Sequence, residues 1–474
     1  MFLSPLMSSV TPLFTNDATV LGILIAVLAG IFYTSSLDIS GWKKFYTYVP
    51  SLLLCYFIPA LLNWPLGIIA PHWFDPSIYE FISKSGLEIA NLHDLNYAEL
   101  KDALKTAGVA GSDISAYEGH SQLYFVASRY LLPASLILLC LGIDFQGIIN
   151  LGPKAVIMFL AASLGIIIGG PIALLVATYL MPDALGAEPM EIAKGLSTIA
   201  GSWIGGGANQ TAMKEIYEVK ENLFGSMIVV DVVVANIWMG FLLYGANISD
   251  KLDLKLKADN SAIEDLKNRV ANYRAGIAEM PTTTSLFIML AVAFGGVAIA
   301  HLGADIISPF LGQFKEALMK YNLTSLTSGF FWLVVIATTY GLALSFTRAK
   351  KLEGIGASRW GSIFIYILVA TIGMKMNLYE VAKNYQLFII GIIWMLIHVS
   401  VLLLVAKIIK APFFFVAVGS QANIGGAASA PIVASAFNPS LAPVGVLMAV
   451  LGYALGTYGA LICAQLMILV AGGG

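Results

Sequence analysis

Runs of about 20 apolar residues alternate with short polar segments along almost the whole chain of 474 residues. A hydrocarbon core about 30 Å thick needs about 20 apolar residues per helix, so each run predicts a membrane-spanning helix. Two further segments, 191–217 and 411–437, are also apolar but are interrupted by glycine, which brings the expected number of spans to twelve. The ten uninterrupted runs are 18–36, 47–70, 122–143, 154–181, 222–246, 284–302, 329–347, 359–374, 385–408 and 441–470.

Two polar segments interrupt this pattern. Residues 71–121 carry an excess of Asp and Glu and predict a small folded cap on the outer side, with a helix over Tyr97–Thr106. Residues 247–283 mix both signs of charge and predict a solvated linker helix. We therefore expect a first half (1–246, including the cap), a charged linker (247–283) and a second half (284–474).

Composition supports a multi-pass membrane protein, since 58% of the residues are hydrophobic and only 11% are charged. The net charge of −2 gives no reason to expect a nucleic-acid partner. Cys55, Cys140 and Cys463 lie in apolar runs without metal-ligand spacing and predict neither a disulfide nor a metal site. No Walker loop, HExxH or Gly-x-Ser-x-Gly element occurs, so we expect neither an enzyme nor ATP-driven transport.

The two glycine-broken segments resemble each other. Each glycine costs about 1 kcal/mol relative to alanine inside a helix, so both segments predict a break at membrane depth. An offset of 218 residues aligns Gly201 with Gly419, Ser202 with Ser420, Gly207 with Gly425, Thr211 with Ser429 and Ala212 with Ala430. The same order of spans surrounds both segments, at 122–246 and 359–470, which predicts an internal repeat.

Charged turns predict how the halves are oriented. Arg348, Lys350, Lys351 and Arg359 place their turn inside by the positive-inside rule, and Lys43 and Lys44 do the same for residues 37–46. The two broken segments then run in opposite directions, so the halves are inverted. Twelve simple spans cannot produce this inversion. An additional crossing at 303–323, a thirteenth span, is the candidate for resolving the conflict.

Paired glycine-broken helices are a sequence indicator of a transporter's substrate site. Their free N–H groups suit an anion and their free carbonyl groups suit Na⁺ or a proton-carrying group. The alternative is that small residues only permit close helix packing. The candidate substrate-binding residues are Ser202, Gly205, Gly206, Gly207, Asn209, Gln210, Thr211, Ser420, Gln421, Asn423, Gly425, Gly426 and Ser429.

Asp231 lies in the apolar run that follows the first broken segment, and Asn236 lies five residues further along. A carboxylate at membrane depth is a candidate functional group because burying its charge in lipid is costly. We expect Asp231 and Asn236 to couple transport to an ion, with Na⁺ possible at Asn209, Gln421, Asn423 and Asp231. The alternative is a structural carboxylate bonded to the broken helix. His301 and His398 stand alone and predict packed, neutral side chains.

The segments Gly-Ser-Trp-Ile-Gly-Gly-Gly-Ala-Asn-Gln at 201–210 and Gly-Ser-Gln-Ala-Asn-Ile-Gly-Gly-Ala-Ala at 419–428 resemble the YjcL-like family of uncharacterised membrane proteins, a domain of unknown function. Two inverted units also resemble the cation/proton antiporter and anion transporter superfamily. The resemblance implies an all-α inverted-repeat transporter fold with two crossed, glycine-broken helices, a core domain, a panel domain and a homodimer.

We expect a secondary active transporter that moves a small polar, anionic organic solute (an amino acid, peptide fragment or carboxylate) by elevator-type symport with Na⁺ or H⁺. Its partners would be this solute and membrane lipid, its location the bacterial cytoplasmic (inner) membrane, and its only cofactor a possible Na⁺. Two alternatives stay open: a cation/proton antiporter without organic cargo, and a membrane enzyme or scaffold.

Overall fold

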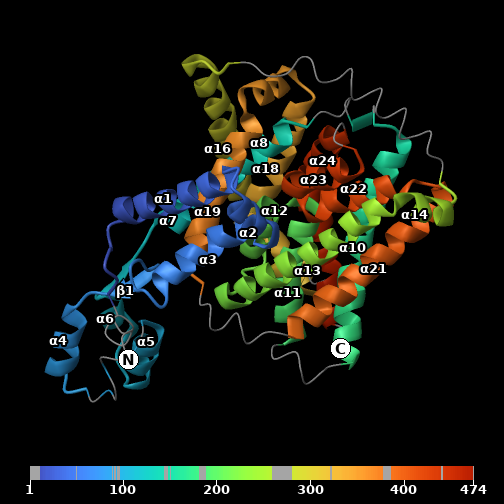
Figure 1. The fold of residues 1–474 in the computed structure, drawn as a ribbon. Helices are drawn as coiled ribbons and strands as arrows, with labels where there is room; N and C mark the ends of the chain where they lie inside the picture. Colours follow the sequence, from blue (N-terminus) through green and yellow to red (C-terminus); the bar gives the residue numbers. More distant parts are fainter. Residues whose placement is uncertain are drawn as a thin grey trace. The chain divides into compact units, whose positions relative to one another are not determined.

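The computed structural model describes residues 11–472 except 50, 88, 90, 91, 93, 94, 96, 144–147, 150, 181–187, 259–279, 321, 322, 377–385, 439 and 440. The chain forms two compact units (Figure 1). Unit 1 comprises Met1–Arg129 and Tyr366–Val381, and unit 2 comprises Tyr130–Ile365 and Ala382–Gly474. The predicted halves 1–246 and 284–474 follow the sequence repeat rather than these units, and they stay a prediction.

Unit 1 contains the cap that the polar segment 71–121 predicts. Strands β1 and β2 pair antiparallel with His72 opposite His120, and the cap helices pack around a small core of Phe74, Ile78, Ile82, Leu100, Leu104 and Ile114. The predicted helix over Tyr97–Thr106 is confirmed, with the same first and last residue. The elements of unit 1 are α1 (Asp17–Ser36), α2 (Ser40–Tyr48), α3 (Ser51–Asn63), β1 (His72–Phe74), α4 (Ser77–Lys84), α5 (Tyr97–Thr106), α6 (Gly111–Ser115), β2 (Glu118–His120) and α7 (Leu123–Val126).

An ion pair joins α5 to β2 in the cap, with Lys101 Nζ 2.5 Å from Glu118 Oε1. Burial alone raises the pKa of Glu118, but hydrogen bonds from Lys101 and Tyr97 outweigh it and hold that pKa below its usual value. The hydrogen bond to Glu118 raises the pKa of Lys101 although burial opposes it. The lowered pKa of Glu118 stabilises the cap at pH values above the pKa of glutamate in the unfolded chain, about 4.3. The raised pKa of Lys101 stabilises the cap at pH values below the pKa of lysine in the unfolded chain, about 10.4.

We therefore expect cap stability to fall as the pH drops through the Glu118 pKa and again as it rises through the Lys101 pKa. Substituting Glu118→Gln should reduce the loss of cap stability at acid pH. Its effect on cap stability at pH 7 should be below about 1 kcal/mol, because Lys101 is partly exposed. Hydrogen exchange of the α5 amides, corrected for intrinsic rates, measures this. If cap stability in Glu118→Gln fell at acid pH as much as in the wild type, Glu118 would not be the group responsible. The control is Glu80→Gln, which removes a carboxylate from the exposed pair Lys84–Glu80.

Unit 2 is a bundle of long apolar helices (Figure 1). The elements of unit 2 are η2 (Ala127–Leu131), α8 (Leu132–Leu141), α10 (Pro153–Leu180), α11 (Pro189–Gly205), α12 (Gly207–Ile216), α13 (Glu221–Asn247), α14 (Ser249–Leu256), α16 (Thr283–Gly312), α17 (Lys315–Lys320), η4 (Thr324–Thr327), α18 (Gly329–Ser345), η5 (Arg348–Ile355), α19 (Ala357–Gly373), α21 (Gln386–Ile409), α22 (Phe413–Ile424), α23 (Gly426–Phe437) and α24 (Ala442–Gly472). Two elements, η2 and α19, belong partly to unit 1.

Within the described residues, seven helices are long and apolar enough to cross a membrane, or nine if each of two bent helix pairs forms one span. This confirms an all-α, multi-pass membrane protein. Helix α16 continues without a break from Thr283 to Gly312, after a capping box at Thr282 and Ser285. The thirteenth crossing expected at 303–323 is therefore wrong, because most of that stretch is the second half of α16 and the short helix α17.

The first broken segment folds back on itself and forms a hairpin, here called hairpin 1 (α11 and α12). The break lies at Gly206, whose φ of 77° and ψ of −174° favour glycine. Its two ends lie together, since Lys220 Nζ is 3.4 Å from Glu191 Oε2. A Cβ on Gly201 would lie 2.6 Å from the carbonyl oxygen of Asn209. Eight residues of continuous helix would separate these positions by about 12 Å, so the chain reverses at Gly206.

The second broken segment forms hairpin 2 (α22 and α23) in the same way, with its break at Gly425 and Gly426. Its base is closed by aromatic contacts, because the ring of Phe437 lies 6.2 Å from that of Phe413 and 5.3 Å from that of Phe414. Near the break, Gln421 Nε2 donates to Ser429 Oγ at 2.7 Å across eight residues of sequence. The predicted glycine breaks are thus confirmed at both positions.

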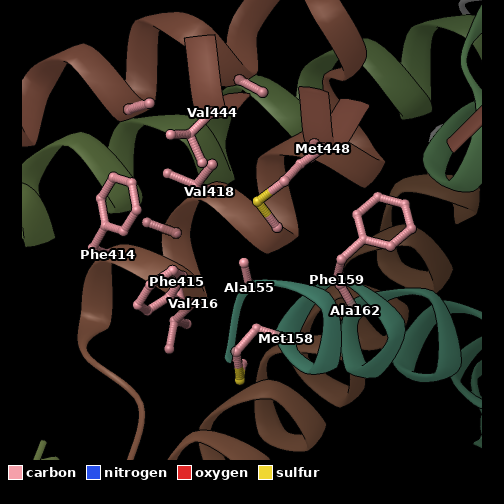
Figure 2. Close-up of a cluster of buried hydrophobic side chains, with 14 of the residues drawn as sticks. Ala155, Met158, Phe159, Ala162, Phe414, Phe415, Val416, Val418, Val444 and Met448 are labelled. Atoms are coloured by element: carbon pink, nitrogen blue, oxygen red, sulfur yellow. The ribbon is translucent and has the colours of Figure 1, made fainter. Parts of the chain in front are cut away.

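The expectation of two crossed helices is corrected by these hairpins. The sequence shows where helical hydrogen bonding stops, but the direction in which the chain continues depends on the packing at the base and tip. The count of twelve to thirteen spans also changes, because it included both hairpins as crossings. A core of apolar side chains from α10, α22 and α24 supports hairpin 2, with Met158, Phe159, Phe414, Val418 and Met448 among them (Figure 2).

Candidate functional site

The glycine tips of both hairpins lie against the same part of α24. A Cβ on Gly452 would lie 2.6 Å from the carbonyl oxygen of Ile204 in hairpin 1 and 3.7 Å from that of Ala422 in hairpin 2. One turn further, a Cβ on Gly456 would lie 2.3 Å from Cα of Gly205. Glycine at these two positions of α24 therefore permits backbone-to-backbone contact with hairpin 1 and brings both tips to one place.

Asp231 on α13 binds hairpin 1 through three uncharged donors. Its Oδ2 accepts from Ser202 Oγ at 2.6 Å and from Gln210 Nε2 at 2.9 Å, and its Oδ1 accepts from Trp203 Nε1 at 2.7 Å. The side chain is only 4% exposed. An indole N–H can only donate, so this arrangement suits an ionised carboxylate. A buried carboxyl group therefore lies close to the tip of hairpin 1, held by side chains that carry no positive charge.

Asn209 and Asn423 make matching sets of hydrogen bonds. The Nδ2 atom of Asn209 donates to the carbonyl oxygens of Gly205 and Tyr453, while its Oδ1 accepts from Thr457 Oγ1 at 2.5 Å. The Nδ2 atom of Asn423 donates to the carbonyl oxygens of Gly419 and Phe159, while its Oδ1 accepts from Ser163 Oγ at 2.7 Å. Each amide thus joins its hairpin to a neighbouring helix, α24 or α10, which is a packing role.

Ser420, which the predicted repeat aligns with Ser202, lies in a hydrogen-bond chain with α13 and α21. Its Oγ accepts from Trp238 Nε1 at 2.8 Å and lies 2.8 Å from His398 Nε2. His398 Nδ1 lies 3.1 Å from the carbonyl oxygen of Ala162, which requires a proton on Nδ1. In neutral His398, Nε2 therefore accepts from Ser420. The two aligned serines thus both form a hydrogen bond with α13, Ser202 with Asp231 and Ser420 with Trp238. These two residues lie two helical turns apart.

We expect Ser420→Ala to destabilise the protein by about 1–3 kcal/mol, because it leaves the buried His398 Nε2 and the partly buried Trp238 Nε1 without a partner. Thermal unfolding of the detergent-purified protein measures the change. Ser400→Ala is the matched control, since Ser400 lies exposed on α21 and bonds only its own helix at Leu396. Equal melting temperatures of the two variants would contradict this role for Ser420.

Gln421 differs from the other amides of the site. Its Nε2 donates to Ser429, but its Oε1 is buried without a hydrogen-bond partner, and the side chain is 2% exposed. Leaving a buried acceptor unpaired costs about 1–3 kcal/mol, so this oxygen is a candidate ligand-binding group. The amide lies against Gly425, where a Cβ would be 2.2 Å from Nε2.

The remaining predicted residues have the following places. Gly206, Gly207, Gly425, Gly426 and Ser429 are partly exposed. Thr211 Oγ1 donates to the carbonyl oxygen of Gly207, and Asn236 Nδ2 to that of Val232, both within their own helices. The described residues contain no group of three His, Cys, Asp or Glu side chains suited to a metal ion. Na⁺ binding at Asn209, Gln421, Asn423 and Asp231 stays a prediction.

Several polar residues of the site were not predicted. Trp203 lies inside the glycine segment, so its sequence position was a usable signal, whereas the contact partners of Trp238 and His398 are distant in sequence. Lys214 on α12 is 4% exposed and pairs with Glu215 at 3.0 Å and Glu221 at 3.4 Å. At the other hairpin, Asp253 of α14 accepts a hydrogen bond from the backbone N–H of Phe413 at 2.7 Å. Lys214 thus lies in ion pairs at the base of hairpin 1, and Asp253 bonds to the base of hairpin 2.

Comparison with known proteins agrees with this membrane architecture. The uncharacterised membrane protein YjcL of Bacillus subtilis (strain 168) is 23% identical over 355 residues, which cover 71% of this chain and 82% of YjcL. The family model described as "Protein of unknown function (DUF819)" matches residues 104–469, a range that includes both hairpins, Asp231 and α24. Because this match extends over most of the sequence, the chain belongs to the DUF819 family of membrane proteins.

Proposed function

We propose that this protein is a secondary active transporter that carries a small polar, anionic organic solute across the membrane together with Na⁺ or H⁺. The observation that carries the proposal is the pair of hairpins whose glycine tips lie against one stretch of α24, at Gly452 and Gly456. Non-helical backbone at membrane depth is tolerated only inside protein or beside water. Both tips are partly exposed at their glycines, which favours a ligand site over simple close packing.

The tips offer suitable chemistry for an anion. Helices α12 and α23 begin at Gly207 and Gly426, and neither has a side-chain hydrogen bond at its N-cap. The first N–H groups of a helix lack partners within it and carry partial positive charge, so both tips can accept a carboxylate. Asp231 supplies a negative charge near hairpin 1, to which a proton or Na⁺ can bind. Solute and coupling ion thus have separate binding groups.

Hairpins also bear on the conflict over orientation, because a hairpin leaves the membrane on the side from which it entered and adds no crossing. Counting α13, α16, α18, α19 and α21 as the crossings that the described residues supply between hairpin 1 and hairpin 2 gives an odd number. An odd number favours hairpins that open to opposite sides. The positive charges at 348–359, Lys407 and Lys410 put the open end of hairpin 2 inside. This supports inverted repeats. Elevator-type movement of the hairpins with their supporting helices, and the bacterial cytoplasmic membrane as the location, are further parts of the same proposal.

Sidedness can be measured with single cysteines at the hairpin bases. We expect Glu218→Cys and Met190→Cys to react with a membrane-impermeant maleimide in intact cells, whereas Lys410→Cys should react only after the cells are opened. The described native cysteines, Cys55, Cys140 and Cys463, are all buried and provide a low background. Reaction of positions 190 and 410 from the same side would contradict the inverted arrangement.

Transport itself is tested by uptake into proteoliposomes of labelled alanine, glutamate, lactate and succinate under an imposed Na⁺ or pH gradient. Accumulation that disappears when the gradient is collapsed supports the proposal, and its absence for all four solutes contradicts it. Proton efflux driven by Na⁺ or K⁺ without an organic solute would instead indicate an antiporter, which the buried Asp231 also suits. A homodimer is part of the same proposal, and light scattering of the purified protein tests it.

A further inference from the structure

We infer that hairpin 2 is an α-amino-acid site, in which Gln421 Oε1 accepts a hydrogen bond from the ammonium group and the N-terminus of α23 binds the carboxylate. This inference rests on the proposed transport function, whose substrate class it specifies. Its central observation is the only side-chain amide acceptor that the described residues leave buried and unpartnered.

Geometry places the two binding groups next to each other. The amide of Gln421 lies against Gly425, the residue that caps the N-terminus of α23. Helix α23 has 12 residues, and its first N–H groups have no acceptor one turn earlier within the helix. In an α-amino acid the ammonium nitrogen and the nearer carboxylate oxygen are about 3 Å apart. One small ligand can therefore reach both the unpartnered acceptor and the helix N-terminus.

Charge distinguishes the two hairpins. Asp231 gives hairpin 1 a buried negative charge, whereas no carboxylate forms a hydrogen bond with Gln421 or Ser429 in the part of the chain that the structure describes. A bare cation is disfavoured beside a helix N-terminus, where the partial charge is positive. A zwitterion satisfies both groups without adding net charge. The coupling cation is therefore assigned to hairpin 1 and the zwitterionic solute to hairpin 2.

The two asparagine amides of the site do not offer an unpartnered oxygen. Asn209 and Asn423 use their oxygen atoms to accept from Thr457 and Ser163. Glycine at position 425 is also required, because a Cβ there would lie 1.7 Å from Ser429 Oγ and 2.2 Å from Gln421 Nε2. The absence of this atom leaves room for the Gln421–Ser429 hydrogen bond beside the break of hairpin 2.

The test compares four compounds of similar size by calorimetry on the purified full chain: L-alanine, L-lactate, propionate and ethylamine. We expect L-alanine to bind at least tenfold more tightly than propionate, L-lactate to bind between them, and ethylamine to bind most weakly. Gln421→Leu should bring L-alanine to within twofold of propionate. Gln313→Leu, the same change at an exposed position of the chain, should leave the preference intact.

A second variant keeps the inference testable if Gln421→Leu does not fold. Gln421→Glu preserves size, and its charge should weaken binding of propionate at least tenfold and improve binding of ethylamine, whose ammonium group it contacts. Equal affinity of the wild type for L-alanine and propionate, a preference that survives in a folded Gln421→Leu variant, unchanged binding of ethylamine and propionate in Gln421→Glu, or no binding of any compound at 50 mM would overturn the inference. Gradient-driven uptake of another solute would then still support the proposed function, and Gln421-dependent binding without uptake would contradict only transport.

Discussion

Replacing Asp231 by asparagine should reduce gradient-driven uptake by about 100-fold while leaving the protein folded. The carboxylate accepts hydrogen bonds from Ser202, Trp203 and Gln210, and asparagine offers only one oxygen for these donors. At least one buried donor then faces an NH₂ group, which costs about 1–3 kcal/mol, and the charge that attracts the coupling ion is lost. A difference of 1.4 kcal/mol corresponds to tenfold, so both effects together account for the expected loss.

Uptake into proteoliposomes and size-exclusion profiles of the same preparation measure function and folding separately. Asp305→Asn is the matched control, because Asp305 lies exposed on α16. Asp231→Glu keeps the charge and should retain part of the uptake. Transport by Asp231→Asn with unchanged ion dependence would show that the carboxylate has only a structural role, bonded to the broken helix.

Replacing Gly206 by alanine should destabilise the protein by about 1–3 kcal/mol and reduce uptake more than tenfold. Gly206 has a φ of 77° and a ψ of −174°, a region that residues with a Cβ essentially never occupy. Space is not the obstacle, because the nearest atom to an added Cβ would be on Tyr453, 3.7 Å away. The added methyl group therefore acts through the backbone, and the tip of hairpin 1 must change its conformation to accept it.

The melting temperature and uptake of Gly206→Ala are compared with those of Gly240→Ala. Gly240 lies in the helical part of α13 with no atom within 4 Å of an added Cβ, so alanine there should be neutral or stabilising by up to about 1 kcal/mol. If Gly206→Ala behaved like Gly240→Ala, the left-handed turn at the tip would not be required for either stability or transport.

Much of hairpin 1 could be predicted from the sequence. Four glycines between 201 and 207 predicted a break in an apolar segment, and the break lies at Gly206. Asp231, recognised as a carboxylate in an apolar run, lies against that break. The prediction of crossed helices was wrong because it took each broken segment to continue across the membrane. The ion pair between Glu191 and Lys220, which holds both ends of hairpin 1 together, joins residues that have no distinguishing local pattern.

The sequence alone determined that this is a multi-pass helical membrane protein with two related glycine-broken segments, because apolar length and helix propensity are local properties of the chain. Only the tertiary structure decided that both segments reverse, and that Asn209 and Asn423 are used in packing while Gln421 keeps an unpaired oxygen. Hydrogen-bond partners such as Ser163 and Thr457 are hundreds of residues away from the groups they bind. Which polar group is left for a ligand therefore depends on long-range contacts, and no local pattern encodes it.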